Sequence, residues 1–154
     1  MVEATVAIAR RPAGLSDATL RRAVSLVLRA ERTRAPISLT FVGPTAMRRL
    51  NHRHRGQDRP TDVLSFALPI GDSVMGDIYL CRAMAAAEAR RRGIPLREEL
   101  VRLVIHGVLH VLGYDHPEAR GRETSPMWAR QERYLARVLR ADLRSAPTKR
   151  RSRS

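Results

Sequence analysis

The segment from Leu96 to Leu112 constrains the fold most, because it is the strongest helix prediction in the chain and is apolar on nearly all sides. Its apolar residues include Leu100, Leu103, Val104, Ile105, Val108, Leu109, Val111 and Leu112. A helix that is apolar all round is buried by other elements rather than exposed along one face. The sequence therefore predicts a buried helix in a globular protein.

Two histidines interrupt this apolar helix. His106 and His110 are four residues apart, so they lie on one face, one turn apart. Gly113 is well placed to end the helix in a left-handed turn, after which His116 can approach the same point. Three histidines leave a fourth zinc position for water, as a catalytic site requires. The pattern predicts one metal ion per chain, bound by His106, His110 and His116 at the end of the helix.

The alternative is that these are ordinary core or surface histidines. Three of the five histidines in the chain fall between residues 106 and 116, and histidines buried there without partners would be costly. Metal ligation explains them better. Zinc is the first choice, although nickel, copper, cobalt and iron also accept imidazole ligands.

The residue after His106 bears on the type of chemistry. Zinc proteases carry H-E-x-x-H, in which the glutamate is the general base, but this chain has Gly107 there. A protease of that kind is disfavoured. Asp115, beside His116, is a candidate general base or a hydrogen-bond partner of a ligand. It is equally well explained as a turn residue.

The remaining segments alternate in type, which indicates an α/β or α+β layer structure. Residues 52–60 contain no apolar residue except Pro60 and predict an exposed loop. The segment 62–68 predicts a buried strand that ends at Pro69. The other expected strands are 5–8, 37–42 and 77–80. The expected helices are 18–32 after an N-cap supplied by Ser16 and Asp17, 45–51 capped by Thr45, 82–92, 96–112 and 127–143.

Length and charge set the domain organisation and the class of partner. The 154 residues fit one domain, expected over 1–145, followed by a basic tail, 146–154, that we expect to be disordered. A net charge of +14 attracts polyanions, nucleic acid first. Lys149 is the only lysine among the 29 basic residues, a bias that a GC-rich genome also produces. Both explanations of the arginine excess remain open.

Two further features concern the compartment. Cys81 is the only cysteine, so no intrachain disulfide can form, which agrees with a reducing compartment. The apolar run Ala4–Ala9 is much too short for a signal-peptide core or a membrane span. We expect a soluble, cytoplasmic protein that does not associate with membranes.

Several motifs in fixed order carry a family resemblance. The run from His106 to His116, H-G-V-L-H-V-L-G-Y-D-H, resembles the signature of the YbeY family of bacterial endoribonucleases, with Val111 in place of a usual leucine. Leu50-Asn51, Arg55-Gly56-Gln57-Asp58 and the run 60–66, P-T-D-V-L-S-F, resemble a second family block, in which His54 replaces a usual tyrosine. Gly76-Asp77-Ile78, Met127 and Glu132 also match.

The resemblance implies an α+β fold with a small mixed sheet, a three-histidine metal site and action on rRNA of the small ribosomal subunit. It further implies that Arg55 is a functional residue. The planar guanidinium of arginine donates two parallel hydrogen bonds to phosphate, and it can stabilise the charge that develops during RNA cleavage. The other explanation of Arg55 is an ordinary solvated arginine. For Asp62 and Ser65 we expect structural roles at the start of a strand.

The resemblance, together with the predicted metal site, thus implies a zinc-dependent, single-strand-specific endoribonuclease of rRNA maturation and small-subunit ribosome quality control. Its expected catalytic residues are Arg55 and Asp115, and its expected partners are rRNA, the small ribosomal subunit and its assembly proteins. Two alternatives stay open. One is a non-catalytic assembly factor that binds rRNA and holds a structural metal, and the other is a metallohydrolase of another substrate.

Overall fold

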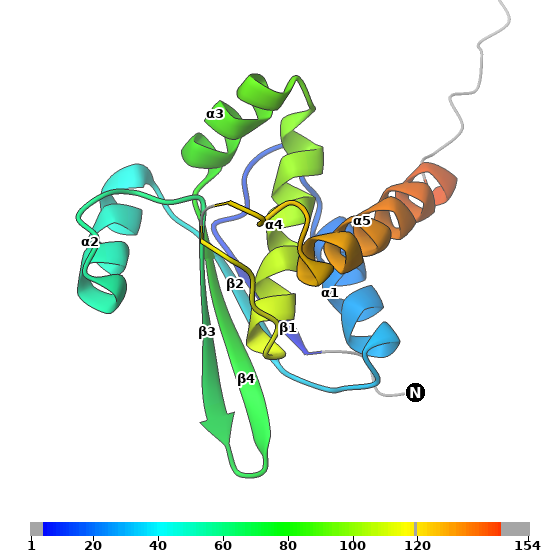
Figure 1. Ribbon diagram of the computed structural model, residues 1–154. Coiled ribbons are helices and arrows are strands. Elements are labelled where there is room, and N and C mark those ends of the chain that lie inside the picture. Colours follow the sequence, from blue (N-terminus) through cyan, green and yellow to red (C-terminus); the bar gives the residue numbers. More distant parts are fainter. Residues whose placement is uncertain (1–4, 119, 146–154) are drawn as a thin grey trace, which may run out of the picture.

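The computed structural model describes residues 5–118 and 120–145, and in these the strands form one mixed sheet of four (Figure 1). The strands are β1 (Val6–Ala9), β2 (Ile37–Phe41), β3 (Val63–Ile70) and β4 (Ser73–Leu80), in the spatial order β1-β2-β4-β3. β1, β2 and β4 are parallel, and β3 is antiparallel to β4. The α+β fold with a small mixed sheet is confirmed.

Five helices surround this sheet in the described part of the chain. They are α1 (Asp17–Ala30), α2 (Pro44–Arg55), α3 (Arg82–Arg92), α4 (Leu96–Val111) and α5 (Pro126–Ser145). α4 packs against β3, β4, α1, α3 and α5. α1, α4 and α5 lie on one side of the sheet and α2 lies on the other (Figure 1). α4 is therefore enclosed by neighbours, which explains why its sequence is apolar on nearly every side.

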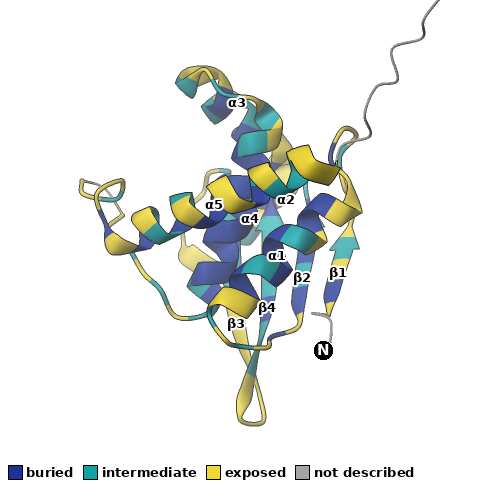
Figure 2. Cartoon of the chain, turned by 90° about the vertical axis from the view of Figure 1, so that its right-hand side faces the viewer, coloured by how far each residue is buried: buried dark blue, intermediate teal, exposed yellow. Residues whose placement is uncertain are grey.

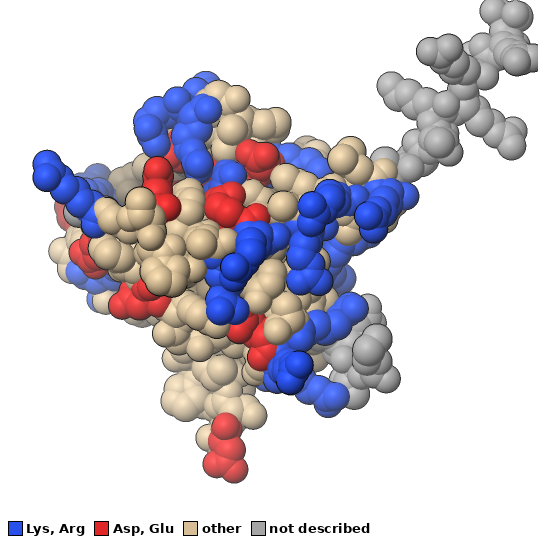
Figure 3. All heavy atoms as spheres, turned by 45° about the vertical axis from the view of Figure 1, so that its right-hand side comes forward, with Lys and Arg blue, Asp and Glu red and all other residues tan. Residues whose placement is uncertain are grey.

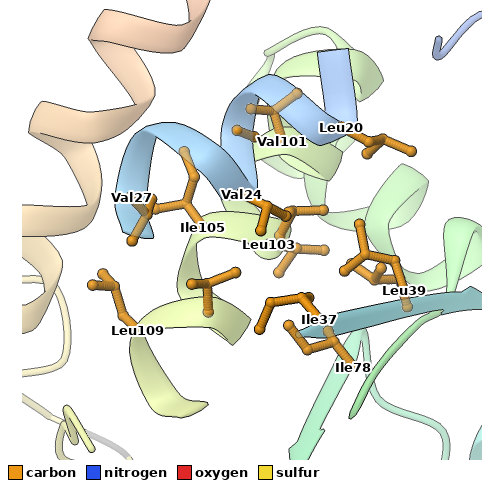
Figure 4. Close-up of a cluster of buried hydrophobic side chains, with 14 of the residues drawn as sticks. Leu20, Val24, Val27, Ile37, Leu39, Ile78, Val101, Leu103, Ile105 and Leu109 are labelled. Atoms are coloured by element: carbon orange, nitrogen blue, oxygen red, sulfur yellow. The ribbon is translucent and has the colours of Figure 1, made fainter. Parts of the chain in front are cut away.

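The main core lies between the sheet and the α1, α4 and α5 layer. Ile37, Leu39 and Ile78 extend from the sheet toward Val24 of α1 and Ile105 of α4 (Figure 4). In Figure 2 the buried residues gather where α1, α4 and the strands face one another, whereas the outer faces of α1 and α5 are exposed. Dense packing on all sides holds the last turns of α4 in a fixed position.

A second, smaller apolar cluster covers the opposite face of the sheet. Its buried members are Met47, Leu64 and Cys81, with Phe66 and Tyr79 packed against them. Successive residues of a strand point to opposite faces, so Ile78 joins the main core while Tyr79 joins this cluster. The cluster fixes α2 and the start of β3, which both border the candidate site.

Three expectations about this region are wrong. The predicted loop 52–60 begins only at Gly56, because α2 continues to Arg55 and ends at Gly56 with a left-handed φ of 70°. α2 begins at Pro44 after Gly43, and Thr45 is not its N-cap. β3 does not end at Pro69 but pairs through it to Ile70.

The expectation of a buried strand at 62–68 is also wrong. β3 is the outer strand of the sheet, and its far half projects with β4 beyond the helices (Figure 1). Leu68 and Ile70 are 41% and 49% exposed. An edge strand tolerates proline, since one side of its backbone has no neighbouring strand to bond. The basic tail at 146–154 lies outside the described residues.

Candidate metal centre and its cavity

The three predicted histidines come together, as their spacing predicts. His106 and His110 lie on successive turns of α4, and His116 follows in the segment after the helix. His116 Nε2 is 3.2 Å from His110 Nε2 and 3.3 Å from His106 Nε2. One nitrogen from each side chain lies within 4.8 Å of the others, so the three could hold one metal ion.

The return of the chain to this point depends on the end of α4. The backbone φ of Gly113 is +98°, a value that residues with a side chain rarely adopt. Its N–H donates to the carbonyl of His110 at 3.0 Å, and the N–H of Tyr114 donates to the carbonyl of Leu109 at 3.0 Å. This pair of bonds is the Schellman motif, which ends a helix at a glycine. It reverses the chain and brings His116 back beside His110.

Each imidazole is oriented by a carbonyl oxygen near its Nδ1. His106 Nδ1 lies 2.7 Å from Gln131 Oε1, His110 Nδ1 lies 3.0 Å from the Tyr114 carbonyl, and His116 Nδ1 lies 2.8 Å from the Pro117 carbonyl. A carbonyl only accepts, so each Nδ1 carries the proton and each Nε2 presents a lone pair. Metal-binding histidines characteristically have such partners.

Burial keeps the imidazoles of His106 and His110 neutral. Burial, with a smaller contribution from the positive charge of the neighbouring His110, lowers the pKa of His106 to about 3. Burial also lowers the pKa of His110, and the nearby His116 adds to the effect. Neutral imidazole is the form that binds metals, so the centre is ready for a cation at neutral pH.

Three lone pairs that converge without a proton between them repel one another, and a cation removes this repulsion. Two nitrogens bound to zinc at about 2.0–2.1 Å in a tetrahedron lie roughly 3.3–3.4 Å apart. The separations of 3.2 and 3.3 Å from His116 Nε2 to the other two are close to that value. The residues therefore fit a small tetrahedral metal ion such as zinc.

Close packing explains why glycine follows His106. A Cβ added to Gly107 would lie 2.9 Å from Ile78 Cγ2 of β4 and 3.0 Å from Ser65 Oγ of β3. No larger side chain fits there without moving the helix away from the sheet. The glutamate base of the H-E-x-x-H proteases is thus excluded by packing as well as by sequence.

A network behind the metal centre fixes the Gln131 amide, which sequence reasoning missed. Gln131, on α5, is 1% exposed, and its Nε2 donates to Glu132 Oε1 at 3.3 Å. Glu132 also accepts from Arg102 Nε at 2.8 Å, and Arg102 NH1 donates to Glu99 at 2.9 Å. The buried Arg102 therefore links α4 to α5 and holds the amide with its oxygen toward His106.

A second network anchors the turn that carries His116. The Glu31 carboxylate, just after α1, accepts from Tyr114 at 2.8 Å, Tyr134 at 2.6 Å and Arg130 at 2.9 Å. Burial raises the pKa of Glu31, but the bonds from Tyr134, Tyr114 and Arg130 outweigh it and lower the pKa overall. Glu31 is therefore ionised at neutral pH and ties the turn to α1 and α5.

The histidines line a cavity of about 950 Å³. Its wall also contains Arg55 and Asp115, the two expected catalytic residues, and Asp62 and Ser65, for which a structural role was expected. Burial raises the pKa of Asp62, and the positive charge of Arg122 opposes this shift. The cavity thus combines a possible metal centre with arginine side chains.

Arg55 and Asp115 occupy the more open parts of the cavity. Arg55 is the last residue of α2, and its NH2 lies 3.2 Å from Glu118 Oε1. Asp115 is exposed, and its Oδ1 accepts the backbone N–H of His116 at 2.8 Å. This contact accounts for Asp115 as a turn residue, while its position on the cavity wall leaves it available to a ligand.

Arg122 is a cavity residue that sequence reasoning missed. It lies in the segment between His116 and α5, outside the motifs that predict the site. Nothing in its sequence context distinguishes it from other arginines. Only the folded chain brings it to the histidines.

Basic side chains are distributed widely over the surface. On the face in Figure 3 they occupy several separate areas and are interleaved with acidic side chains. A distributed positive charge attracts polyanions without specifying where they bind. Selection of a ligand therefore depends on the cavity. In the described residues, none of the helices is both long and apolar enough for a membrane span.

Comparisons with known proteins agree with this architecture. The family model described as "Endoribonuclease YbeY" matches residues 11–139. A protein of that name from Moorella thermoacetica is 42% identical over 134 residues, which cover 78% of this chain and 85% of the relative. A second, from Chlorobium luteolum, is 38% identical over 82% of this chain and 91% of the relative. A Thermotoga maritima protein solved in solution is 29% identical, with a TM-score of 0.64 over 95% of this chain and 99% of that one.

Proposed function

Because the chain belongs to the Endoribonuclease YbeY family, we propose that it is a metal-dependent endoribonuclease specific for single-stranded RNA. Its proposed role is rRNA maturation and small-subunit ribosome quality control in the cytoplasm. The proposed partners are rRNA, the small ribosomal subunit and its assembly proteins. One observation carries the proposal: three imidazoles present their Nε2 atoms together on the wall of an arginine-lined cavity.

His106, His110 and His116 are the proposed ligands of one zinc ion. When bound, the metal supplies a Lewis acid that polarises a phosphate oxygen or lowers the pKa of a water molecule. The protein holds the three imidazoles through Gln131 and the carbonyls of Tyr114 and Pro117. Ligands fixed in this way need no rearrangement when the substrate arrives.

Arg55 and Asp115 are the proposed catalytic side chains. Arg55 stands at the end of α2 with 43% of its side chain exposed, and Glu118 holds it in place. Its guanidinium can exchange this partner for a phosphate that gains charge during cleavage. Asp115 is the proposed general base, because its exposed carboxylate lies on the same wall as the metal ligands.

The test is cleavage of a short single-stranded rRNA fragment by protein purified free of contaminating ribonuclease. Wild type is expected to cut it and to leave the corresponding duplex intact. His110→Ala is expected to lose both bound metal and cleavage while it keeps its secondary structure. Equal cleavage by His110→Ala and wild type would contradict the proposal. Tight RNA binding without cleavage by metal-loaded wild type would favour the assembly-factor alternative.

A further inference from the structure

Arg122 occupies a distinctive position beside the metal centre. It lines the large cavity of about 950 Å³ and also a smaller adjoining cavity of about 240 Å³. His106 and Asp62 line both cavities as well. Arg122 therefore lies at the junction of the two cavities. A ligand bound at the three histidines and extending into the smaller cavity would pass beside it.

The guanidinium of Arg122 lacks the partners that its neighbours have. Arg55 pairs with Glu118, Arg91 with Glu88 and Arg102 with Glu99. Within residues 5–118 and 120–145, Arg122 forms no such ion pair, and its Nε is buried without a hydrogen-bond partner. A buried polar donor without a partner is costly. The position therefore favours an anion that enters from the cavity.

The nearby carboxyl groups are already engaged. Glu88 is held by Arg91 at 2.5 Å. The backbone N–H groups of Asp62 and Val63 and the Thr61 hydroxyl, whose Oγ1 lies 3.4 Å from Asp62 Oδ1, lower the pKa of the Asp62 carboxyl against the opposite effect of burial. Asp62 is a competitor for Arg122, since the two attract each other without an ion pair. An incoming anion thus meets a guanidinium whose hydrogen-bond donors are available.

We propose that Arg122 binds a backbone phosphodiester of single-stranded RNA, next to the phosphate that faces the three histidines. This deepens the proposed function, on which it depends only for RNA as the source of the phosphate. Arginine suits the task because its planar fork can donate two hydrogen bonds to one phosphate. Arg55 and Arg122 would then contact the RNA from different parts of the cavity wall.

The experiment measures binding of a single-stranded 2′-O-methyl oligoribonucleotide, which lacks the free 2′-hydroxyl, as a function of salt. The variants are Arg122→Ala, Arg122→Lys and the control Arg120→Ala, which removes the same charge from an exposed residue of the same segment. Arg122→Ala should weaken binding about tenfold and reduce the slope of log Kd against log salt by about 0.7, the value for one contact with single-stranded RNA. Arg122→Lys should retain part of the affinity, and Arg120→Ala should stay within about twofold of wild type.

Equal losses in Arg122→Ala and Arg120→Ala would overturn the inference, because they would reduce Arg122 to a source of general positive charge. Unchanged binding with a lower melting temperature would also overturn it, in favour of pairing with Asp62. If Arg122→Ala does not fold, a wild-type salt slope and affinity in Arg122→Lys would overturn it instead.

Should wild type bind RNA through Arg122 but fail to cut a cleavable strand, the endoribonuclease proposal fails and this inference stands. If Arg122→Ala still cleaves RNA and binds it with wild-type affinity, this inference fails and the endoribonuclease proposal stands.

Discussion

Gln131 Oε1 lies 2.7 Å from His106 Nδ1, and the two residues are only 1% and 4% exposed. This bond keeps the imidazole proton on Nδ1 and leaves Nε2 for a metal. On the other side of the amide, Gln131 Nε2 donates a hydrogen bond to Glu132 Oε1 at 3.3 Å. The orientation of a ligand on α4 is thus determined from α5.

Replacing Gln131 by leucine should therefore weaken the metal centre. Gln131→Leu leaves the buried Nδ1–H of His106 without an acceptor, and loss of such a partner typically lowers metal affinity about 10–100-fold. Zinc affinity measured by competition with a chelator tests this. Gln131→Glu, which keeps an acceptor at the same place, is the control and should bind zinc more tightly than Gln131→Leu. If Gln131→Leu bound zinc as tightly as wild type, the Gln131 amide would have no role in zinc binding.

The Glu31 network gives a prediction with a built-in comparison. Tyr114 and Tyr134 both donate to Glu31, but only Tyr114 belongs to the turn that supports His110 and His116. Each Tyr→Phe change should lower the free energy of unfolding by about 1.5–3 kcal/mol, the usual effect of losing a hydrogen bond to a charged group. Only Tyr114→Phe should also reduce zinc affinity. Equal zinc affinities in the two variants would show that the network supports the fold alone.

The metal-free protein should lose stability as the pH falls below about 6.5. The pKa of His106 is about 3 in the folded chain, against an ordinary value of 6.5, because burial disfavours its charged form. Between these values the unfolded chain binds more protons, so stability is intact above pH 6.5 and declines toward pH 3. Urea unfolding in the presence of a chelator, from about pH 7.5 to about pH 5, measures this decline.

His106→Asn should reduce the pH dependence of unfolding in that window, since it removes one of the two histidines whose pKa burial lowers and leaves His110. His52→Asn is the control, because His52 is exposed, and should preserve the wild-type slope. The same slope in His106→Asn and wild type would mean that other groups cause the acid sensitivity. Added zinc should stabilise the protein at neutral pH and lose this effect as the histidines become protonated.

Local signals account for the elements that the sequence predicted well. The helix at Arg82–Arg92 was predicted with its observed bounds, because Gly93 supplies the left-handed residue that ends it. The three histidines were found because all of them fall between residues 106 and 116, where helix geometry and one turn determine their distances. The main parts of α1, β2, α4 and α5 were likewise predicted to within a few residues.

Errors arose where tertiary contacts decide the outcome. The end of α2, His52 to Arg55, has no apolar periodicity, so it resembles a loop although Gly56 ends a helix there. Pro69 suggested the end of a strand, but it lies on the sheet edge, where a missing N–H costs nothing. Gln131 is 25 residues from His106 in the sequence. Neither its role nor that of Arg122 follows from local spacing, because packing between elements brings them to the site.

The Gly107 position predicts a stability effect that sequence alone would not give. Gly107→Ala adds a Cβ that would lie 2.9 Å from Ile78 Cγ2, so overpacking should cost about 1–3 kcal/mol of unfolding free energy, even though alanine favours helices. The double variant Gly107→Ala with Ile78→Ala should recover part of the loss relative to Ile78→Ala alone. Chemical denaturation measures each value. A gain in stability for Gly107→Ala in the wild-type background would contradict the close approach of α4 to β4.

Arg55 and Arg53 separate a specific catalytic role from general positive charge. Both are exposed residues near the end of α2, but of the two only Arg55 lines the cavity of the metal centre. If Arg55 stabilises charge on the phosphate, Arg55→Ala should cost about 2–4 kcal/mol in transition-state stabilisation, by analogy with the loss of an oxyanion-hole donor. Arg55→Lys should also be impaired, because lysine lacks the bidentate fork. Arg53→Ala should cleave RNA nearly as fast as wild type. All three variants should keep their metal content and melting temperature, since substitutions of exposed residues rarely cost much stability.

Glu118→Gln, which releases Arg55 from its ion pair, should leave cleavage intact or raise it. Equal losses at Arg55 and Arg53 would reduce Arg55 to one of many positive charges, and unchanged cleavage in Arg55→Ala would remove it from the mechanism.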